Sequence, residues 1–256
     1  MAADRVKRDV HADRVEQVQA CLATVVDPEL DESVTELGFI TELELLGQGE
    51  VRIGFRLPTY WCAANFAFLM ADDMRRAVQV LPWVTRVQVH LHDHMYAEAI
   101  NQGVADGAGF QAAFGVAAEG GLDVLRRTFE LKAFQRRQEA LLQHLIDAGH
   151  LPATLVALDQ PALQRLLLLD ADGGRLLERY IERRALAGGG ALAFVDTEGR
   201  PIAADALAGH LRALRPVGIN AEFNGALCRG LLAVRDNEAG VHKIHIVRRP
   251  QSADML

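Results

Sequence analysis

The sequence predicts an α+β protein, and the order of two helical patterns and three strand-like runs supports this class. Residues 11–24 and 64–80 carry apolar side chains at helical spacing, whereas residues 39–46, 51–57 and 84–92 resemble strands. The order helix, hairpin, helix, strand predicts a small two-layer helix/sheet sandwich over residues 8–100. A chain of 256 residues has room for a second domain, which we also expect to be α+β and to contain a long helix.

The first helix and the hairpin follow from simple periodicities. Val15, Val18, Leu22 and Val25 form one apolar stripe of a helix, and Cys21 lies on the same stripe, so we expect Cys21 in the core. Residues 51–57 alternate between apolar and polar side chains, which predicts a strand with one buried face. Glycines in residues 47–49 favour a tight turn between the two strands.

The second helix and the third strand complete the sandwich. Apolar residues three or four positions apart define one face of the helix: Phe66, Met70, Met74, Ala77 and Leu81. In residues 84–92, His90 and His92 share the face opposite to the apolar one, and His94 continues their parity. Residues two apart on a strand lie roughly 6.6 Å apart, close enough for two imidazoles to share a metal ion. An ordinary solvated sheet face rich in histidine is the alternative.

The rest of the chain predicts a linker and a C-terminal α+β domain of unknown role. Residues 101–121 are rich in glycine and alanine and predict the linker, and residues 122–256 form the second domain. Residues 122–147 predict its long helix. A turn at residues 196–199, a helix at 203–214 that ends before Pro216, and strands at 231–235 and 241–247 follow.

Composition and charge exclude several classes of protein. Residues 1–110 hold 17 acidic and 9 basic residues, a net charge of −8, so nucleic acid is not an expected partner. No apolar run is long enough to span a membrane, and the charged first residues do not resemble a secretory signal. Three widely spaced cysteines form no disulfide framework, so we expect the reducing cytoplasm.

Cys62 is the candidate reactive residue. It lies between a strand that ends near Leu57 and a helix that begins just after it. Unpaired backbone N–H groups at a helix start favour a negative charge nearby, and a thiolate attacks electrophiles or binds metal. The alternative is a small buried cysteine with no reactivity.

The residues upstream of Cys62 resemble a known family. An Asp27-Pro28-Glu29 loop is followed by Leu37-Gly38-Phe39-Ile40, and later by Thr59 and the single Cys62 at a helix start. About residues 12–95 therefore resemble the iron–sulfur cluster assembly domain family of the SufT and PaaD type. This sequence has Ala63 where that family usually has proline after the cysteine.

The resemblance implies an accessory protein that delivers iron or a cluster to a client metalloenzyme, or matures it, rather than an enzyme. Cys62 would hold iron or an iron–sulfur cluster transiently, with Asp27, Glu29 and Thr59 completing or tuning the site. One thiolate cannot supply all the ligands of a cluster, so further ligands would come from a homodimer, from His90 and His92, or from the client. Relatives of the PaaD type suggest an oxygenase system as the client.

Two other functions remain open at the level of sequence. Cys62 could be the nucleophile of an enzyme, in which case His90 or His92 would have to lie beside it as the base. The chain could also be a binding scaffold in which Cys62 is buried away from polar neighbours. Cys228, beside an apolar run, is expected to be structural.

Overall fold

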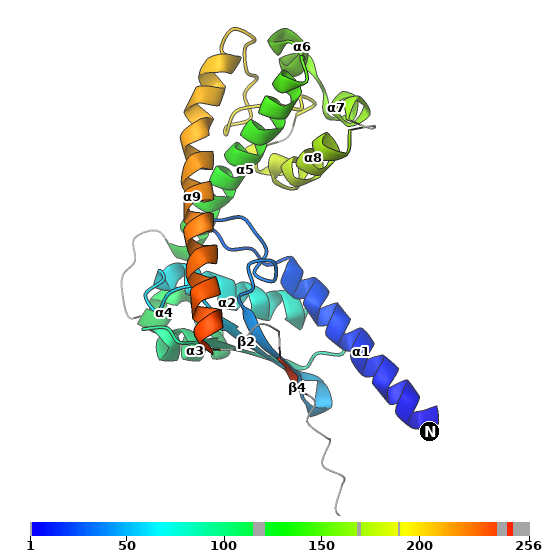
Figure 1. Ribbon diagram of the computed structural model, residues 1–256, viewed down its shortest axis with the longest axis vertical. Coiled ribbons are helices and arrows are strands. Elements are labelled where there is room, and N and C mark those ends of the chain that lie inside the picture. The colour runs from blue at the N-terminus through cyan, green and yellow to red at the C-terminus, as the bar shows by residue number, and fades with distance from the viewer. Residues whose placement is uncertain (1, 115–120, 168–169, 189, 240–244, 248–256) are drawn as a thin grey trace, which may run out of the picture. The chain divides into compact units, whose positions relative to one another are not determined.

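The computed structural model describes residues 2–114, 121–167, 170–188, 190–239 and 245–247, and it confirms the α+β class (Figure 1). The chain divides into two compact units. The first consists of Met1–Asp123 together with Gly225–Leu256, and the second consists of Val124–Asn224. The C-terminal segment thus belongs to the same unit as the N-terminal domain, which differs from the predicted boundary at residues 122–256.

The first unit is built on a mixed four-stranded sheet with the order β3-β2-β1-β4. Its strands are β1 (Ile40–Leu45), β2 (Glu50–Arg56), β3 (Arg86–His92) and β4 (His245–Val247). The hairpin β1–β2 is antiparallel, as predicted, while β3 is parallel to β2 and β4 is parallel to β1. Between β1 and β2, the short helix η1 (Gly47–Gly49) places Gly49 at φ +82°, which only glycine adopts without strain.

Helices cover the apolar face of this sheet. They are α1 (Ala2–Ala23), α2 (Ala64–Gln79), α3 (Ala97–Ala105) and α4 (Phe110–Phe114), and α2 is the crossover between the parallel strands β2 and β3. Alternate residues of the strands point into the core: Leu43, Val51, Ile53, Phe55, Val87, Val89 and Leu91. The opposite face carries polar side chains such as Glu42, Arg52 and His90, as the alternation predicted.

Part of the predicted linker is helical and packed. Ile100 and Val104 of α3 are fully buried in the core of the first unit. Gly103 is needed for this packing, because a Cβ atom there would lie 2.5 Å from Cβ of Ala113. The linker prediction is therefore corrected for residues 101–114; residues 115–120 lie outside the described part of the chain.

The second unit contains the predicted long helix. Its helices are α5 (Gly121–Asp147), α6 (Pro152–Ala157), α7 (Gln160–Leu166), α8 (Ala171–Arg184) and η2 (Ala185–Ala187), and the first part of α9 (Leu207–Ala239) follows. In the described residues of this unit, β structure is confined to isolated bridges, Asp159 with Leu192 and Val195 with Pro201. The Val195–Pro201 bridge flanks the turn predicted at residues 196–199.

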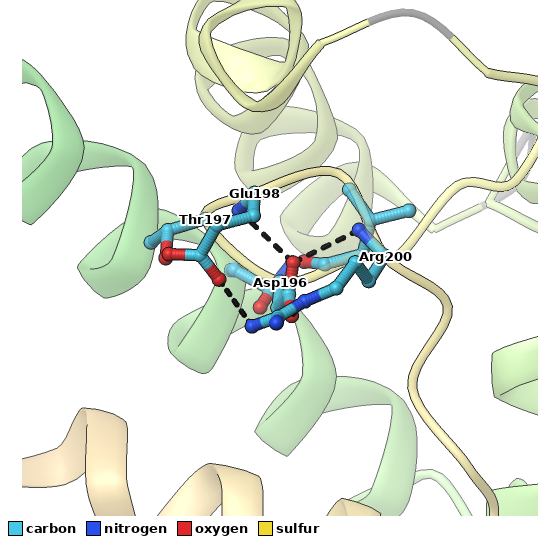
Figure 2. Close-up of polar contacts among 6 residues, drawn as sticks. Asp196, Thr197, Glu198 and Arg200 are labelled. Carbon is cyan, nitrogen blue, oxygen red and sulfur yellow. Dashed lines mark hydrogen bonds and ion pairs between the residues drawn. The ribbon is translucent and has the colours of Figure 1, made fainter.

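Polar side chains order this turn and the core beneath it. Figure 2 shows Asp196, whose Oδ1 accepts hydrogen bonds from the backbone N–H groups of Glu198 and Arg200, both at 2.9 Å. The Arg200 guanidinium pairs with the other oxygen of Asp196 at 2.6 Å. In the core, Nε2 of the fully buried Gln138 donates to the carbonyl of Val195 at 2.8 Å. The buried amide of Gln138 thus finds its acceptor in the irregular segment of this unit.

Two predictions about the last 60 residues are wrong. Helix α9 does not end before Pro216 but continues through it to Ala239. Residues 231–235 are helical rather than a strand, because a short apolar run does not distinguish a buried strand from a packed helix face. Of the strand predicted at 241–247, residues 245–247 form β4, and residues 241–244 lie outside the described part.

Candidate functional site

Cys62 occupies the predicted turn between strand and helix. β2 ends at Arg56, α2 begins at Ala64, and the N-cap residue Ala63 makes no side-chain capping bond. Cys62 is half-buried, and its Sγ lies 3.0 Å from Oγ1 of Thr59. A thiolate can only accept a hydrogen bond, so in the ionised state the Thr59 hydroxyl donates to the sulfur. The predicted partner Thr59 therefore contacts the cysteine directly.

His94 fixes the backbone of this turn. Strand β3 ends at His92, and Asp93 takes φ +50°, which turns the chain so that His94 leaves the sheet. His94 is only 5% exposed, and its Nε2 lies 2.8 Å from the carbonyl oxygen of Cys62. Its Nδ1 accepts from the backbone N–H of Tyr96 at 3.1 Å, so Nε2 carries the proton and donates to that carbonyl.

Asp27 holds the acidic loop together. Its Oδ1 accepts hydrogen bonds from the backbone N–H groups of Glu29 at 2.9 Å and Leu30 at 2.8 Å. Burial raises the pKa of Asp27, and the two backbone hydrogen bonds oppose that shift. Glu29 is exposed. The two predicted site carboxylates thus have different roles in the loop, because one is buried and structural while the other faces solvent.

The end of helix α9 is anchored on the first unit by one of its faces. We call this the anchoring face; it consists of Cys228, Leu232 and Arg235, which are spaced i, i+4, i+7. Leu232 is 6% exposed and joins the core. Arg235 donates to the carbonyl of Leu57 at 2.6 Å and to that of Asp93 at 3.2 Å. In Figure 1 this segment is the orange-red end of α9.

Cys228 packs on the first unit within electrostatic range of Cys62. Both side chains are half-buried and pack against the core of the first unit. Burial raises the pKa of the Cys228 thiol to about 11, and the negative charges of Asp27, Cys62 and Glu29 add to this effect. The neighbouring Arg229, which pairs with Glu32 at 2.8 Å, opposes it. The acidic loop, the Cys62 turn and α9 thus meet at one end of the unit.

His90 and His92 lie on the polar sheet face, as predicted. Their ring centroids are 4.9 Å apart. Burial lowers the pKa of His92, as does the neighbouring His90, whereas the carboxylate of Glu42 opposes the shift. Among the residues that the structure describes, three or more His, Cys, Asp or Glu side chains nowhere gather as a metal site. The predicted metal set of Cys62, His90 and His92 is therefore not assembled within the described chain.

Comparisons with known proteins bear on the first unit. Residues 15–90 match the family model described as an iron-sulfur cluster assembly protein. The uncharacterized protein MJ1129 of Methanocaldococcus jannaschii is 30% identical over 87 residues, 34% of this chain and 90% of that protein. The chain belongs to the iron–sulfur cluster assembly protein family. The predicted resemblance is confirmed.

A second relative of this chain has a name that states its function. It is the Fe-S protein maturation auxiliary factor YitW of Bacillus subtilis, 29% identical over 76 residues, 30% of this chain and 72% of that protein. No solved structure matches the chain. The matches to the family model and to YitW together support a role in iron–sulfur cluster assembly or maturation. In the described part of the chain, we find no helix with the length and apolar character needed to cross a membrane.

Sequence reasoning missed three residues at this site. His94 was placed on the sheet face by parity, and only the positive φ of Asp93 directs it to Cys62. Cys228 and Arg235 could not be assigned from sequence, because they reach the site through a helix that starts in the other unit. A helical interpretation of residues 228–235 would have revealed their common face.

Proposed function

We propose that this protein is a maturation factor that carries iron or an iron–sulfur cluster to a client metalloenzyme through Cys62. The main support is the position of Cys62: the residue is half-buried, its sulfur lies 3.0 Å from the Thr59 hydroxyl, and His94 fixes the turn that carries it. A soft thiolate is a suitable ligand for iron and its clusters. The family supports iron–sulfur chemistry as the class of process.

An incomplete ligand set suits transfer. A cluster bound by four protein ligands is stable and leaves slowly, whereas cargo held by fewer ligands passes to a client that supplies the rest. The first unit offers no group of three or more metal-binding side chains within its described residues. During transfer, the remaining ligands of the iron or cluster would therefore come from the client, from a second copy of the chain, or from water.

An exposed apolar surface beside Cys62 favours a protein as the recipient. Trp61 is 71% exposed and Tyr60 is 55% exposed, and both precede Cys62 directly. Met95 and Tyr96 are also exposed, and the N–H of Met95 donates to the carbonyl of Tyr60 at 2.9 Å. Exposed Trp, Tyr and Met side chains are enriched at protein interfaces. We propose that the client docks here, and the resemblance to PaaD-type relatives suggests an oxygenase system.

The enzyme alternative is less well supported. A nucleophilic cysteine needs a base within hydrogen-bond reach of its sulfur. Among the described residues, His94 contacts Cys62, but it donates to the backbone carbonyl of Cys62 rather than to the sulfur. The scaffold alternative expected a cysteine buried away from polar neighbours, and Thr59 contradicts that expectation.

Client maturation tests the proposal. The client is co-expressed with the wild-type protein, with Cys62→Ser, or with the control Cys21→Ser, and its iron content and activity are measured. We expect Cys62→Ser to abolish maturation and to change stability by less than about 1 kcal/mol, because serine differs little in size. Cys21→Ser should keep maturation. Full maturation with a folded Cys62→Ser variant would refute the cysteine-based function.

A further inference from the structure

We propose that Cys228 is a second metal-binding thiolate, and that Cys62 and Cys228 together bind a thiophilic divalent metal ion as a two-sulfur site. This inference deepens the proposed function, because it names the second ligand for the iron cargo. It adds a residue from outside the matched region 15–90.

The geometry of α9 supports this pairing. Cys228 is the first residue of the anchoring face, one helical turn before the buried Leu232 and two turns before Arg235. Arg235 binds the carbonyls of Leu57 and Asp93, which follow the ends of β2 and β3, and Cys62 lies five residues after Leu57. Because the helix is held at this point, the half-buried Cys228 packs against the core of the first unit.

A second anchor lies next to Cys228. Nη1 of Arg229 donates to both oxygens of the Glu32 carboxylate, at 2.8 and 3.1 Å. Glu32 belongs to the loop that Asp27 organises. The helix therefore bridges the acidic loop on one side and the strand ends on the other. Cys228 and Cys62 both pack against the apolar core of the first unit.

The electrostatics agree with this arrangement. The charge of Cys62 contributes to the raised pKa of Cys228, as do the charges of Asp27 and Glu29, so these groups lie within mutual electrostatic range. The two thiols and the carboxylates of Asp27 and Glu29 favour binding of a positive ion, and the neighbouring Arg229 opposes it. A bound divalent cation would offset both the cost of burying the Cys228 thiolate and its repulsion by these groups.

The binding step is a simple exchange. Each thiol loses one proton to solvent, two metal–sulfur bonds form, and two water ligands leave the hydrated ion, with no change in oxidation state. Two sulfurs fill half of a tetrahedral coordination shell, and the remaining positions stay open to water or to ligands of the recipient. Because each thiol must lose its proton to bind the ion, the affinity for the metal rises with pH.

Cobalt titration tests the site in the full-length protein. Co²⁺ is added under anaerobic conditions, and sulfur-to-metal charge-transfer absorption reports the thiolate ligands. We expect the wild-type protein to show two sulfur ligands, and Cys62→Ser and Cys228→Ser each to lose one sulfur and to bind Co²⁺ at least about tenfold more weakly. The control Cys21→Ser should behave as the wild-type protein, because Cys21 lies on α1.

Differential alkylation of the wild-type protein provides a measurement that needs no variant. Bound Co²⁺ should protect Cys62 and Cys228 together, but not Cys21, from a thiol reagent. Protection of Cys62 alone, or unchanged Co²⁺ binding in Cys228→Ser, would overturn the proposal while leaving Cys62-dependent maturation intact. Full maturation of the client by Cys62→Ser, combined with the loss of one sulfur ligand to Co²⁺ in that variant, would instead reject the proposed function and keep the metal pair.

Discussion

Replacing Leu232 by alanine tests whether the end of α9 belongs to the core of the first unit. Leu232 is 6% exposed, and its Cδ2 would lie 3.7 Å from a Cβ atom added to Gly38. Removing a buried leucine side chain costs its transfer free energy and leaves a cavity, so we expect a loss of about 2–4 kcal/mol. The adjacent Leu231 is 39% exposed and is a matched control, for which we expect less than about 1 kcal/mol.

Urea unfolding followed by tryptophan fluorescence measures this effect in the relevant unit. Trp61 and Trp83 are the two tryptophans of the chain, and both belong to the first unit. With a slope of about 2 kcal/mol per molar urea, Leu232→Ala should lower the midpoint by roughly 1–2 M. The control Leu231→Ala should leave it nearly unchanged, because leucine and alanine have similar helix propensities.

Equal midpoints for the two variants would refute the reasoning. They would mean that the anchoring face adds nothing to the stability of the first unit. The predicted boundary near residue 100 would then describe the folding unit better than the division seen in the structure.

Three further substitutions test other contacts of the first unit. His94→Ala removes two hydrogen bonds to backbone at a buried position and should lower the free energy of unfolding in urea by about 2–4 kcal/mol. The control His90→Ala, at an exposed position, should lower it by less than about 0.5 kcal/mol. Equal losses would show that His94 does not hold the Cys62 turn. Gly54→Ala should cost about 1–3 kcal/mol in the same assay, because its Cβ would lie 2.9 Å from atoms of two neighbouring side chains, and an unchanged midpoint would contradict this crowding. Burial raises the pKa of Asp27 above its ordinary value of about 4. Between these two pKa values the native state binds more protons than the unfolded state, so the free energy of unfolding falls as the pH rises. Asp27→Asn should remove this fall in unfolding free energy measured against pH, and a slope identical to that of the wild-type protein would argue against a raised pKa.

The sequence by itself determined the sandwich of the first unit and its family. Strict alternation in residues 51–57 and 87–91, and helical spacing in residues 66–81, place apolar side chains on one face of each element. Such faces can be buried in only a few ways, so local periodicity was sufficient to predict β2, α2 and β3, and the glycine turn at residues 47–49 indicated β1 as the hairpin partner of β2. The turn that carries Cys62 followed from the same pattern, because it joins a predicted strand to a predicted helix.

Tertiary structure alone decided what surrounds Cys62. The positive φ of Asp93 directs His94 to the Cys62 carbonyl, and neither periodicity nor composition reports the φ of a single non-glycine residue. The contribution of Cys228 required α9 to continue through Pro216 and return to the first unit, against the local preference of proline to end a helix. That helix is favoured by the burial of Leu232 and by the hydrogen bonds of Arg235 to two carbonyls. These contacts join residues far apart in the sequence, so a local pattern does not contain them.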